Sequence, residues 1–283
     1  MARIHTYLTA FTLVAFAANS LLCRMALGPG TIDPVSFTSL RLGSGALALA
    51  VICRLNGGDR RRAQSGSWLS GLVLFAYALA FSLAYVSLDT GTGALILFGM
   101  VQLTMITTAL RTGERPSARQ WIGVLAGVGG LTYLVLPGLS APDPVGAAMM
   151  AVAGTAWATY TLRGKGAQAP IALTAGNFAR SVPFAIGATA VGWSSRHLQS
   201  EGVALAVTSG VITSGLGYAL WYRVLPKLST TQASVLQLLV PVIAAFAGVA
   251  ILGEALSSRL VIASALILGG VALAVVRARP ARA

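Results

Sequence analysis

The sequence predicts an all-α integral membrane protein with ten transmembrane helices, arranged as two inverted five-helix repeats. Three observations predict it: the apolar residues form ten long blocks, the basic residues cluster at one set of block ends, and the second half of the chain resembles the first. Hydrophobic residues make up 56% of the 283 residues and charged residues only 10%, whereas soluble domains have about 25% charged residues. This shortage of charge excludes an ordinary soluble enzyme, a disordered chain and a coiled coil.

Each apolar block is long enough for a membrane helix, because a bilayer core about 30 Å thick needs about 20 apolar residues of helix to cross it. Turn-forming residues such as Gly28-Pro29-Gly30 and Pro142-Asp143-Pro144 separate the blocks. Since most links are short, neighbouring helices are expected to be antiparallel and packed together. The blocks cover roughly residues 6–27, 35–54, 68–88, 91–110, 119–137, 144–163, 171–193, 201–223, 230–252 and 258–276.

The first block has an alternative interpretation as a signal peptide. Arg3 precedes it, and Ala15-Phe16-Ala17 resembles a cleavage site. The apolar stretch nevertheless continues to Leu22 without a break. We therefore expect a first membrane helix here, which the internal repeat also requires.

The basic residues predict the orientation in the membrane. With a cytoplasmic N-terminus, fifteen of the twenty Lys and Arg residues fall at inner ends and loops, and only Arg24, Arg196 and Arg259 fall at outer ones. By the positive-inside rule, this indicates a multi-pass protein of a bacterial inner (plasma) membrane with both termini cytoplasmic. The net charge of +13 then lies along one membrane face, which favours contact with the lipid bilayer and argues against a nucleic-acid partner.

Motifs of enzymes and cofactor sites are missing from the sequence. It has no phosphate-binding loop, no nucleophile elbow and no His-Glu-x-x-His pair. Cys23 and Cys53 fall near opposite membrane faces without other metal ligands, so we expect packed thiols. The sequence therefore predicts a protein that is not an enzyme and that has no cofactor and no metal, with a membrane-embedded enzyme as the less favoured alternative.

The two halves of the chain align with each other. At a shift of 140, Gly113-Glu114 falls on Gly253-Glu254, and at a shift of 139, two arginines of the first half fall on two of the second, Arg24 on Arg163 and Arg41 on Arg180. Each half, residues 1–140 and residues 141–283, holds five helices. Because five is odd, the second repeat is inverted in the membrane. Such repeats are typical of transporters, with a substrate site near the midplane.

These motifs resemble the EamA type of the drug/metabolite transporter superfamily. The resemblance rests on Gly-Glu pairs after the fourth and ninth helices, on the Gly-rich helices that follow them, and on the arginines of helices two and seven. It implies an inner-membrane exporter of small metabolites that works by alternating access. Amino acids are the first expected substrates, large neutral and aromatic ones among them, because within this superfamily the chain resembles the bacterial amino acid exporters, which include the YddG-like (aromatic) amino acid exporters. Nucleotide sugars, sugar phosphates and drugs are the alternatives. The segment 98–104 lacks the proline common in helix four of the family.

Polar residues within the bilayer are costly and are candidates for function. Arg180, near mid-depth, could hold a substrate carboxylate or bridge helices. Arg41 lies closer to the outer boundary, which it could reach by extending its side chain, and a structural role is favoured for it. Gln102 and Gln237 could bond both the amino and the carboxylate group of an amino acid, or could link helices.

Aromatic residues on helices three and eight follow helical spacing and could line a pocket for an apolar side chain, or could form an interfacial belt. The expected substrate-binding residues are Tyr77, Phe81, Phe98, Gln102, Trp157, Tyr160, Arg180, Tyr218, Trp221 and Gln237. Pro183 and Pro241 interrupt helices and are candidate hinges. The seven acids all lie at helix ends or in loops, so no buried proton relay is expected. A small-molecule substrate and lipid are the expected partners, for either a monomer or a weak homodimer.

Overall fold

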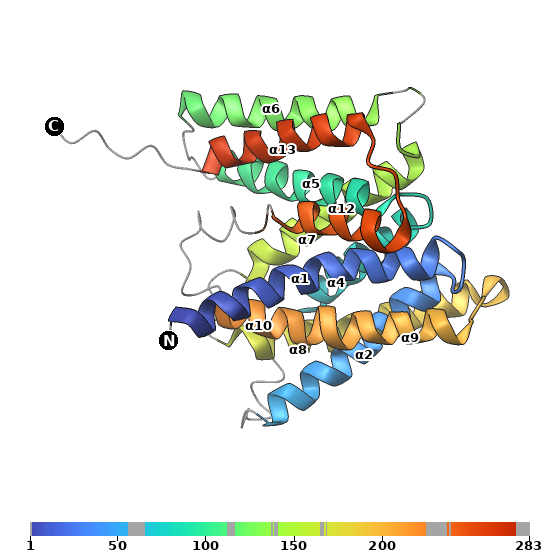
Figure 1. Ribbon diagram of the computed structural model, residues 1–283. Helices are drawn as coiled ribbons and strands as arrows, with labels where there is room; N and C mark the ends of the chain where they lie inside the picture. The colour runs from blue at the N-terminus through green and yellow to red at the C-terminus, as the bar shows by residue number, and fades with distance from the viewer. Residues whose placement is uncertain are drawn as a thin grey trace.

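The computed structural model is a bundle of antiparallel helices that pack side by side (Figure 1). It describes residues 2–55, 66–111, 117–136, 138, 141–164, 167, 169–224, 237 and 239–275. Among these residues there is no β-strand, and the only β-type pairing is an isolated bridge between Ile32 and Leu198. Both cysteines are buried free thiols, at separate places in the bundle.

The helices follow the ten predicted blocks closely. The ninth block begins at residue 230, and its first part lies outside the described residues except for Gln237. The first half contains α1 (Ala2–Leu27), α2 (Pro34–Leu55), α4 (Trp68–Ala84), α5 (Thr90–Arg111) and α6 (Ala118–Val135). The second half contains α7 (Pro144–Gly164), α8 (Pro170–Val191), η1 (Trp193–Ser195), the continuous α9, η2 and α10 (Ser200–Thr208, Ser209–Leu216 and Gly217–Val224), α12 (Leu239–Leu252) and α13 (Ser258–Val275).

Local sequence explains where several helices begin. Side-chain oxygens of Asp33, Ser67 and Asp143 accept hydrogen bonds from backbone N–H groups three residues ahead, at 2.9, 3.1 and 2.6 Å respectively. These bonds satisfy donors that have no partner in the first turn of a helix. Proline occupies the first position of α2, α7 and α8, where its missing N–H costs nothing.

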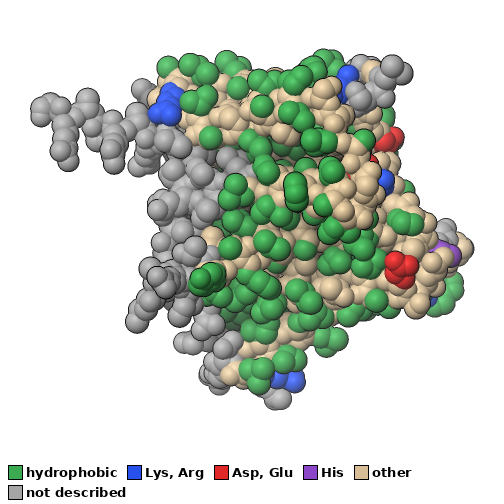
Figure 2. All heavy atoms as spheres, in the orientation of Figure 1, with side chains coloured by type: hydrophobic (Ala, Val, Ile, Leu, Met, Phe, Trp, Pro, Cys, Tyr) green, Lys and Arg blue, Asp and Glu red, His purple; other side chains and the backbone are tan. Residues whose placement is uncertain are grey.

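The surface of the bundle is apolar. By length and composition, five helical segments of the described residues are able to cross a membrane. Hydrophobic side chains cover the middle of the visible face, and the coloured charges lie towards its edges (Figure 2). Leu47, Val191 and Phe246 are each more than 70% exposed. An apolar surface of this extent is suited to hydrocarbon and not to water. The spans are Tyr7–Leu27, Pro34–Leu55, Thr90–Thr108, Pro144–Gly164 and Ser200–Trp221, with shorter apolar helices at Trp68–Ala84, Trp121–Val135, Leu239–Leu252 and Ser258–Leu273.

Helix contacts follow the internal repeat. Three helices of the first half pack against their own counterparts in the second: α2 against α8, α5 against α12, and α6 against α13. The remaining contacts are reciprocal, since α4 packs against α7 while α1 packs against α9, η2 and α10. The start of α1 and the end of α13 lie at the same end of the bundle (Figure 1). We call this the N-terminal end, and the other the Arg24 end.

One packing detail recurs in both repeats. A Cβ built on Gly71 of α4 would lie 2.8 Å from the Cβ of Arg180 and 3.0 Å from its carbonyl carbon. A Cβ on Gly210 of η2 would collide with the carbonyl oxygen of Arg41 and with the hydroxyl of Ser44. Gly210 and Arg41 are the repeat partners of Gly71 and Arg180, so the same glycine-to-arginine contact occurs twice, and each time it joins a helix of one repeat to a helix of the other.

Candidate functional site

A small aromatic cavity lies inside the bundle, between helices of both repeats. Its volume is about 20 Å³, which holds roughly one water molecule. It includes five of the residues expected at the substrate site. Its lining consists of Phe16, Asn19, Ser20, Tyr77, Phe81, Leu97, Phe98, Trp157, Thr213 and Tyr218.

Trp157 of α7 lies at the centre of the aromatic lining. Its ring centroid is 5.0 Å from that of Tyr77 on α4 and 5.0 Å from that of Tyr218 on α10. Phe16 of α1 contacts the same group from a third side, 5.9 Å from Tyr218. These separations are typical of attractive aromatic pairs. Since the rings nearly fill the cavity, a substrate larger than water requires them to move apart.

The lining also has a polar part, which includes Asn19 and Thr213, and Thr213 lies in the segment where the helix changes from α to π geometry. Residues Ser209–Leu216 form a π-helix, η2, and π turns are frequent at functional sites. The side-chain oxygen of Asn19 accepts hydrogen bonds from the hydroxyls of Ser209, at 2.8 Å, and Thr213, at 3.0 Å. The structure thereby adds α1 to the helices expected around the site, and it shows that the eighth predicted helix contains a π turn there.

Arg41 is buried beside this cavity with an exposed fraction of 1%. Its Nε donates to the hydroxyl oxygen of Ser214 at 3.1 Å, and its Nη2 donates to that of Tyr77 at 3.2 Å. Its guanidinium carbon lies 5.3 Å from the ring centre of Tyr77 and 5.1 Å from that of Phe81. Nη1 has no hydrogen-bond partner among the described residues. The side chain therefore turns into the bundle and does not extend to the outer boundary, because its donors and ring contacts are inside.

Tyr160 and Trp221, also expected at the site, support the cavity rings from behind. The ring of Tyr160 stacks on Trp157 with centroids 5.8 Å apart, and its hydroxyl oxygen lies 3.5 Å from the Asn177 amide. Trp221 packs against Phe16 with centroids 5.7 Å apart. Both side chains are buried.

None of the expected polar residues is among the described residues that line this cavity. Gln102 is buried, but it lines a separate pocket of about 10 Å³ against α6 and α13. Arg180 is half-buried, and its Nη1 donates to the carbonyl of Gly176 at 3.0 Å. A Cβ on Gly66, just before α4, would lie 3.0 Å from the same Nη1, so Arg180 lies towards the N-terminal end of the bundle. Gln237 is half-buried, and the residues on either side of it lie outside the described ranges.

The two candidate hinges have different settings. Pro183 lies inside α8, which continues on both sides of it from Pro170 to Val191. Pro241 is buried near the start of α12. At Pro183 the missing N–H removes a hydrogen bond from the interior of the helix, whereas Pro241 lies in the first turn of the described α12, where proline is tolerated.

A second, larger groove of about 400 Å³ opens between α4, α5 and α7. Small and apolar side chains line it, and its polar groups are the hydroxyls of Thr155 and Thr159. Both hydroxyls already donate to backbone carbonyls of their own helix, at 3.0 and 2.8 Å. The aromatic cavity, with its polar wall and adjacent cation, is therefore the better candidate site.

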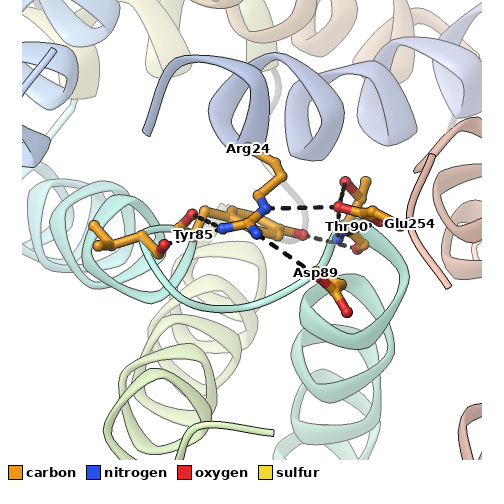
Figure 3. Close-up of polar contacts among 6 residues, drawn as sticks. Arg24, Tyr85, Asp89, Thr90 and Glu254 are labelled. Atoms are coloured by element: carbon orange, nitrogen blue, oxygen red, sulfur yellow. Dashed lines mark hydrogen bonds and ion pairs between the residues drawn. The ribbon is translucent and has the colours of Figure 1, made fainter. Parts of the chain in front are cut away.

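An ionic cluster closes the Arg24 end of the bundle (Figure 3). The carboxylate of Glu254 accepts hydrogen bonds from the backbone N–H and the hydroxyl of Thr90, both at 2.9 Å. Arg24 lies 3.6 Å from Glu254 and 3.7 Å from Asp89. It also donates to the carbonyl of Tyr85 at 3.1 Å. The cluster joins α1, the link between α4 and α5, and the link between α12 and α13, and it gives the Gly-Glu motif of the second repeat a structural position.

A group of hydrogen bonds around Asp33, which we call the clasp of Asp33, lies at the same end. The carboxylate of Asp33 accepts from the N–H groups of Ser36 at 2.9 Å and His197 at 3.1 Å, and the N–H of Asp33 donates to the carbonyl of His197 at 3.0 Å. Partial burial alone raises the pKa of Asp33, but these hydrogen bonds outweigh it, so the pKa lies below its usual value. The clasp connects the α1–α2 link to the link before α9.

Comparisons with known proteins match this architecture. A model of the EamA-like transporter family matches residues 5–136 and again residues 144–276. An uncharacterized protein of Pseudomonas aeruginosa is 49% identical over 269 residues, which cover 94% of this chain and 92% of that protein. A solved crystal structure aligns with a TM-score of 0.65 at 20% identity, over 94% of this chain and 97% of the other. The double family match confirms the predicted fold class of two repeats.

Some relatives have named substrates. The threonine/homoserine exporter RhtA of Salmonella typhimurium is 34% identical over 164 residues. The match covers 56% of this chain and 54% of the exporter, so the likeness extends over about half of each protein.

Proposed function

The chain belongs to the EamA-like transporter family, and from this we propose that it exports amino acids across a bacterial inner membrane, with large neutral and aromatic ones among them. The observation that carries the proposal is the cavity in which rings of both repeats meet around Trp157. An apolar pocket with a few polar groups is suited to a small amphipathic molecule. The partial likeness to a threonine/homoserine exporter supports amino acids as the substrate class.

In this proposal the cavity residues contact the substrate, and the repeats move around them. Tyr77, Phe81, Phe98, Trp157 and Tyr218 hold the side chain of the substrate. The two repeats, residues 1–140 and 141–283, rock against each other so that the cavity opens to one side at a time. Pro183 and Pro241 are the proposed hinges.

We place the N-terminal end in the cytoplasm and the Arg24 end on the outer side, following the distribution of basic residues. The ionic cluster and the clasp of Asp33 then hold the outer side closed. Export requires both to separate, so the outer links move during each transport cycle.

Sugar phosphates and nucleotide sugars are the second candidate class. Their phosphate groups call for several cations around the binding site. Within the described part of the chain, Arg41 is the one cation recorded against the cavity rings. The amino acid proposal is therefore preferred. The membership of the chain in a transporter family supports a function in transport and not in catalysis.

Measurement of export in cells tests the proposal. Bacteria that overproduce the protein are fed dipeptides, which raise the internal concentration of single amino acids, and the medium is analysed by mass spectrometry. We expect faster release of large neutral amino acids than from cells with an empty vector. Equal release of every amino acid by both strains would contradict the proposal.

A further inference from the structure

Arg41 is a buried cation to which the described residues supply no opposite charge. The ion pairs recorded among those residues join Arg24 to Asp89 and Glu254 at the end of the bundle. Arg41, in contrast, is 1% exposed and makes its polar contacts with neutral hydroxyls. An intramembrane cation of this kind is costly and points to a functional role.

The guanidinium retains unused hydrogen-bonding capacity. It has five N–H donors in a planar fork. One on Nε donates to Ser214 and one on Nη2 donates to Tyr77. Nη1 is buried without a hydrogen-bond partner among the described residues. A planar group with free donors is suited to a carboxylate, which can accept two parallel hydrogen bonds.

The position of the cation is fixed by groups that belong to the cavity. Tyr77 and Phe81 line the cavity, and their rings also lie 5.3 and 5.1 Å from the guanidinium carbon. Ser214 lies on the π-helix one residue after Thr213, another cavity residue. Gly210 allows the same π-helix to approach the backbone of Arg41 closely. The cation is therefore held in place before any ligand arrives.

We propose that Arg41 binds the carboxylate of the transported molecule, with Nη1 as the donor that the substrate satisfies. The inference rests on the proposed transport of amino acids and specifies its recognition. The carboxylate supplies the charge that Arg41 lacks, while the rings around Trp157 receive the apolar side chain. Molecules without a negative group leave the cation unpaired and are rejected, which makes Arg41 a specificity residue.

Arg180, its repeat partner, does not meet these conditions in the structure. It is half-buried, its Nη1 already donates to the carbonyl of Gly176, and it lies beside Gly66 at the start of α4. From the sequence, Arg180 could hold a substrate carboxylate or bridge helices; the arrangement around the cavity favours Arg41 for the carboxylate.

Competition on the wild-type protein tests the inference without mutation. Purified protein in liposomes preloaded with phenylalanine or threonine exchanges it for labelled external amino acid. The competitors are the same amino acid, its carboxamide and its amino alcohol. We expect the two carboxylate-free analogues to compete about 10- to 100-fold less well, which is the loss typical of a removed hydrogen bond to a charged group. Equal competition by all three would overturn the role of Arg41.

Substitutions of Arg41 test whether the discrimination against carboxylate-free analogues depends on this residue. Arg41→Gln should lower the apparent affinity for the amino acid about 10- to 100-fold and remove the discrimination against the carboxamide, whereas Arg41→Lys should retain part of both. Arg196→Gln, which removes an exposed arginine that packs on Trp193, is the matched control and should behave as wild type. A folded Arg41→Gln protein with wild-type discrimination would overturn the inference. If that variant fails to fold, Arg41→Lys and the wild-type competition decide it.

The outcomes separate the two proposals. If wild-type protein exchanged neither phenylalanine nor threonine nor any other amino acid, the proposed function would be refuted, and the role of Arg41 with it. Exchange that ignores the carboxylate would refute only the role of Arg41.

Discussion

The carboxylate of Glu254 accepts two hydrogen bonds from Thr90, one from the backbone N–H and one from the hydroxyl, each 2.9 Å long. Thr90 begins α5 of the first repeat, and Glu254 follows α12 of the second (Figure 3). The Gly-Glu motif thus caps a helix of the other repeat and also lies 3.6 Å from Arg24. A residue of the family motif therefore ties the two repeats together at one end of the bundle.

Replacement of this carboxylate should loosen the Arg24 end. Glu254→Ala leaves the N–H of Thr90 without an acceptor, so we expect a loss of about 1–3 kcal/mol in the free energy of unfolding and faster hydrogen exchange at residues 85–93. Glu201→Ala, at an exposed position in the first turn of α9, is the control and should change stability by less than about 0.5 kcal/mol. Equal effects of the two changes would show that the cluster does not stabilise this end.

The clasp of Asp33 predicts a pH dependence of stability. Its folded pKa is lowered, so the carboxylate stabilises the protein fully above its unfolded pKa of about 3.9. That contribution is lost as the pH falls through the lower folded pKa. Thermal unfolding of detergent-solubilised protein between pH 6 and pH 3 should show a wild-type advantage over Asp33→Asn that shrinks only at the acid end. A constant difference across this range would contradict the lowered pKa.

The contact between Gly210 and Arg41 predicts a strict size limit. A methyl group at position 210 collides with the backbone of α2, so Gly210→Ala should destabilise the protein by about 1–3 kcal/mol and weaken transport by displacing Arg41. Gly187→Ala, on α8 with open space around it, is the matched control and should be neutral or slightly stabilising, because alanine favours helices. A tolerated methyl group at 210 would contradict the close contact between η2 and α2.

The aromatic centre predicts a dependence of transport on substrate size. Trp157→Phe replaces the indole by a smaller apolar ring and so changes the space next to the substrate side chain. Because phenylalanine and threonine differ in side-chain size, their rates in liposome exchange should change by different factors. Trp193→Phe, at an exposed tryptophan outside the cavity, should leave both rates unchanged. Identical factors for the two substrates in Trp157→Phe would place substrate contact elsewhere.

Most of the fold can be predicted from the sequence because membrane helices leave a simple signal. Block length, together with prolines such as Pro34 and Pro144 at helix starts, locates most of the helix ends within a few residues. Helical spacing also identifies Tyr77 and Phe81 as one face of α4, and the structure places both on the cavity. For an apolar residue, its spacing along the helix and its depth in the membrane together predict which part of the bundle it contacts.

The polar part of the site is less predictable for a physical reason. Counting along a helix gives the depth of a residue but not the direction of its side chain across the bundle. Gln102 therefore lies against α6 and α13, while Arg41 turns inwards to Tyr77. The π-helix around Thr213 has no periodic signature in the sequence. The sequence marks Arg41 by its position within a membrane helix and by its alignment with Arg180, but neither signal shows which way its side chain points.

Exchange of labelled amino acid into liposomes preloaded with the same unlabelled amino acid is the simplest test of amino acid transport, because it requires only the protein and its substrate. For large neutral amino acids we expect more label to accumulate than in protein-free liposomes, and in matching liposomes we expect no accumulation of labelled sugar phosphate. If the sugar phosphate accumulated and no amino acid did, the proposal that this protein transports amino acids would be contradicted.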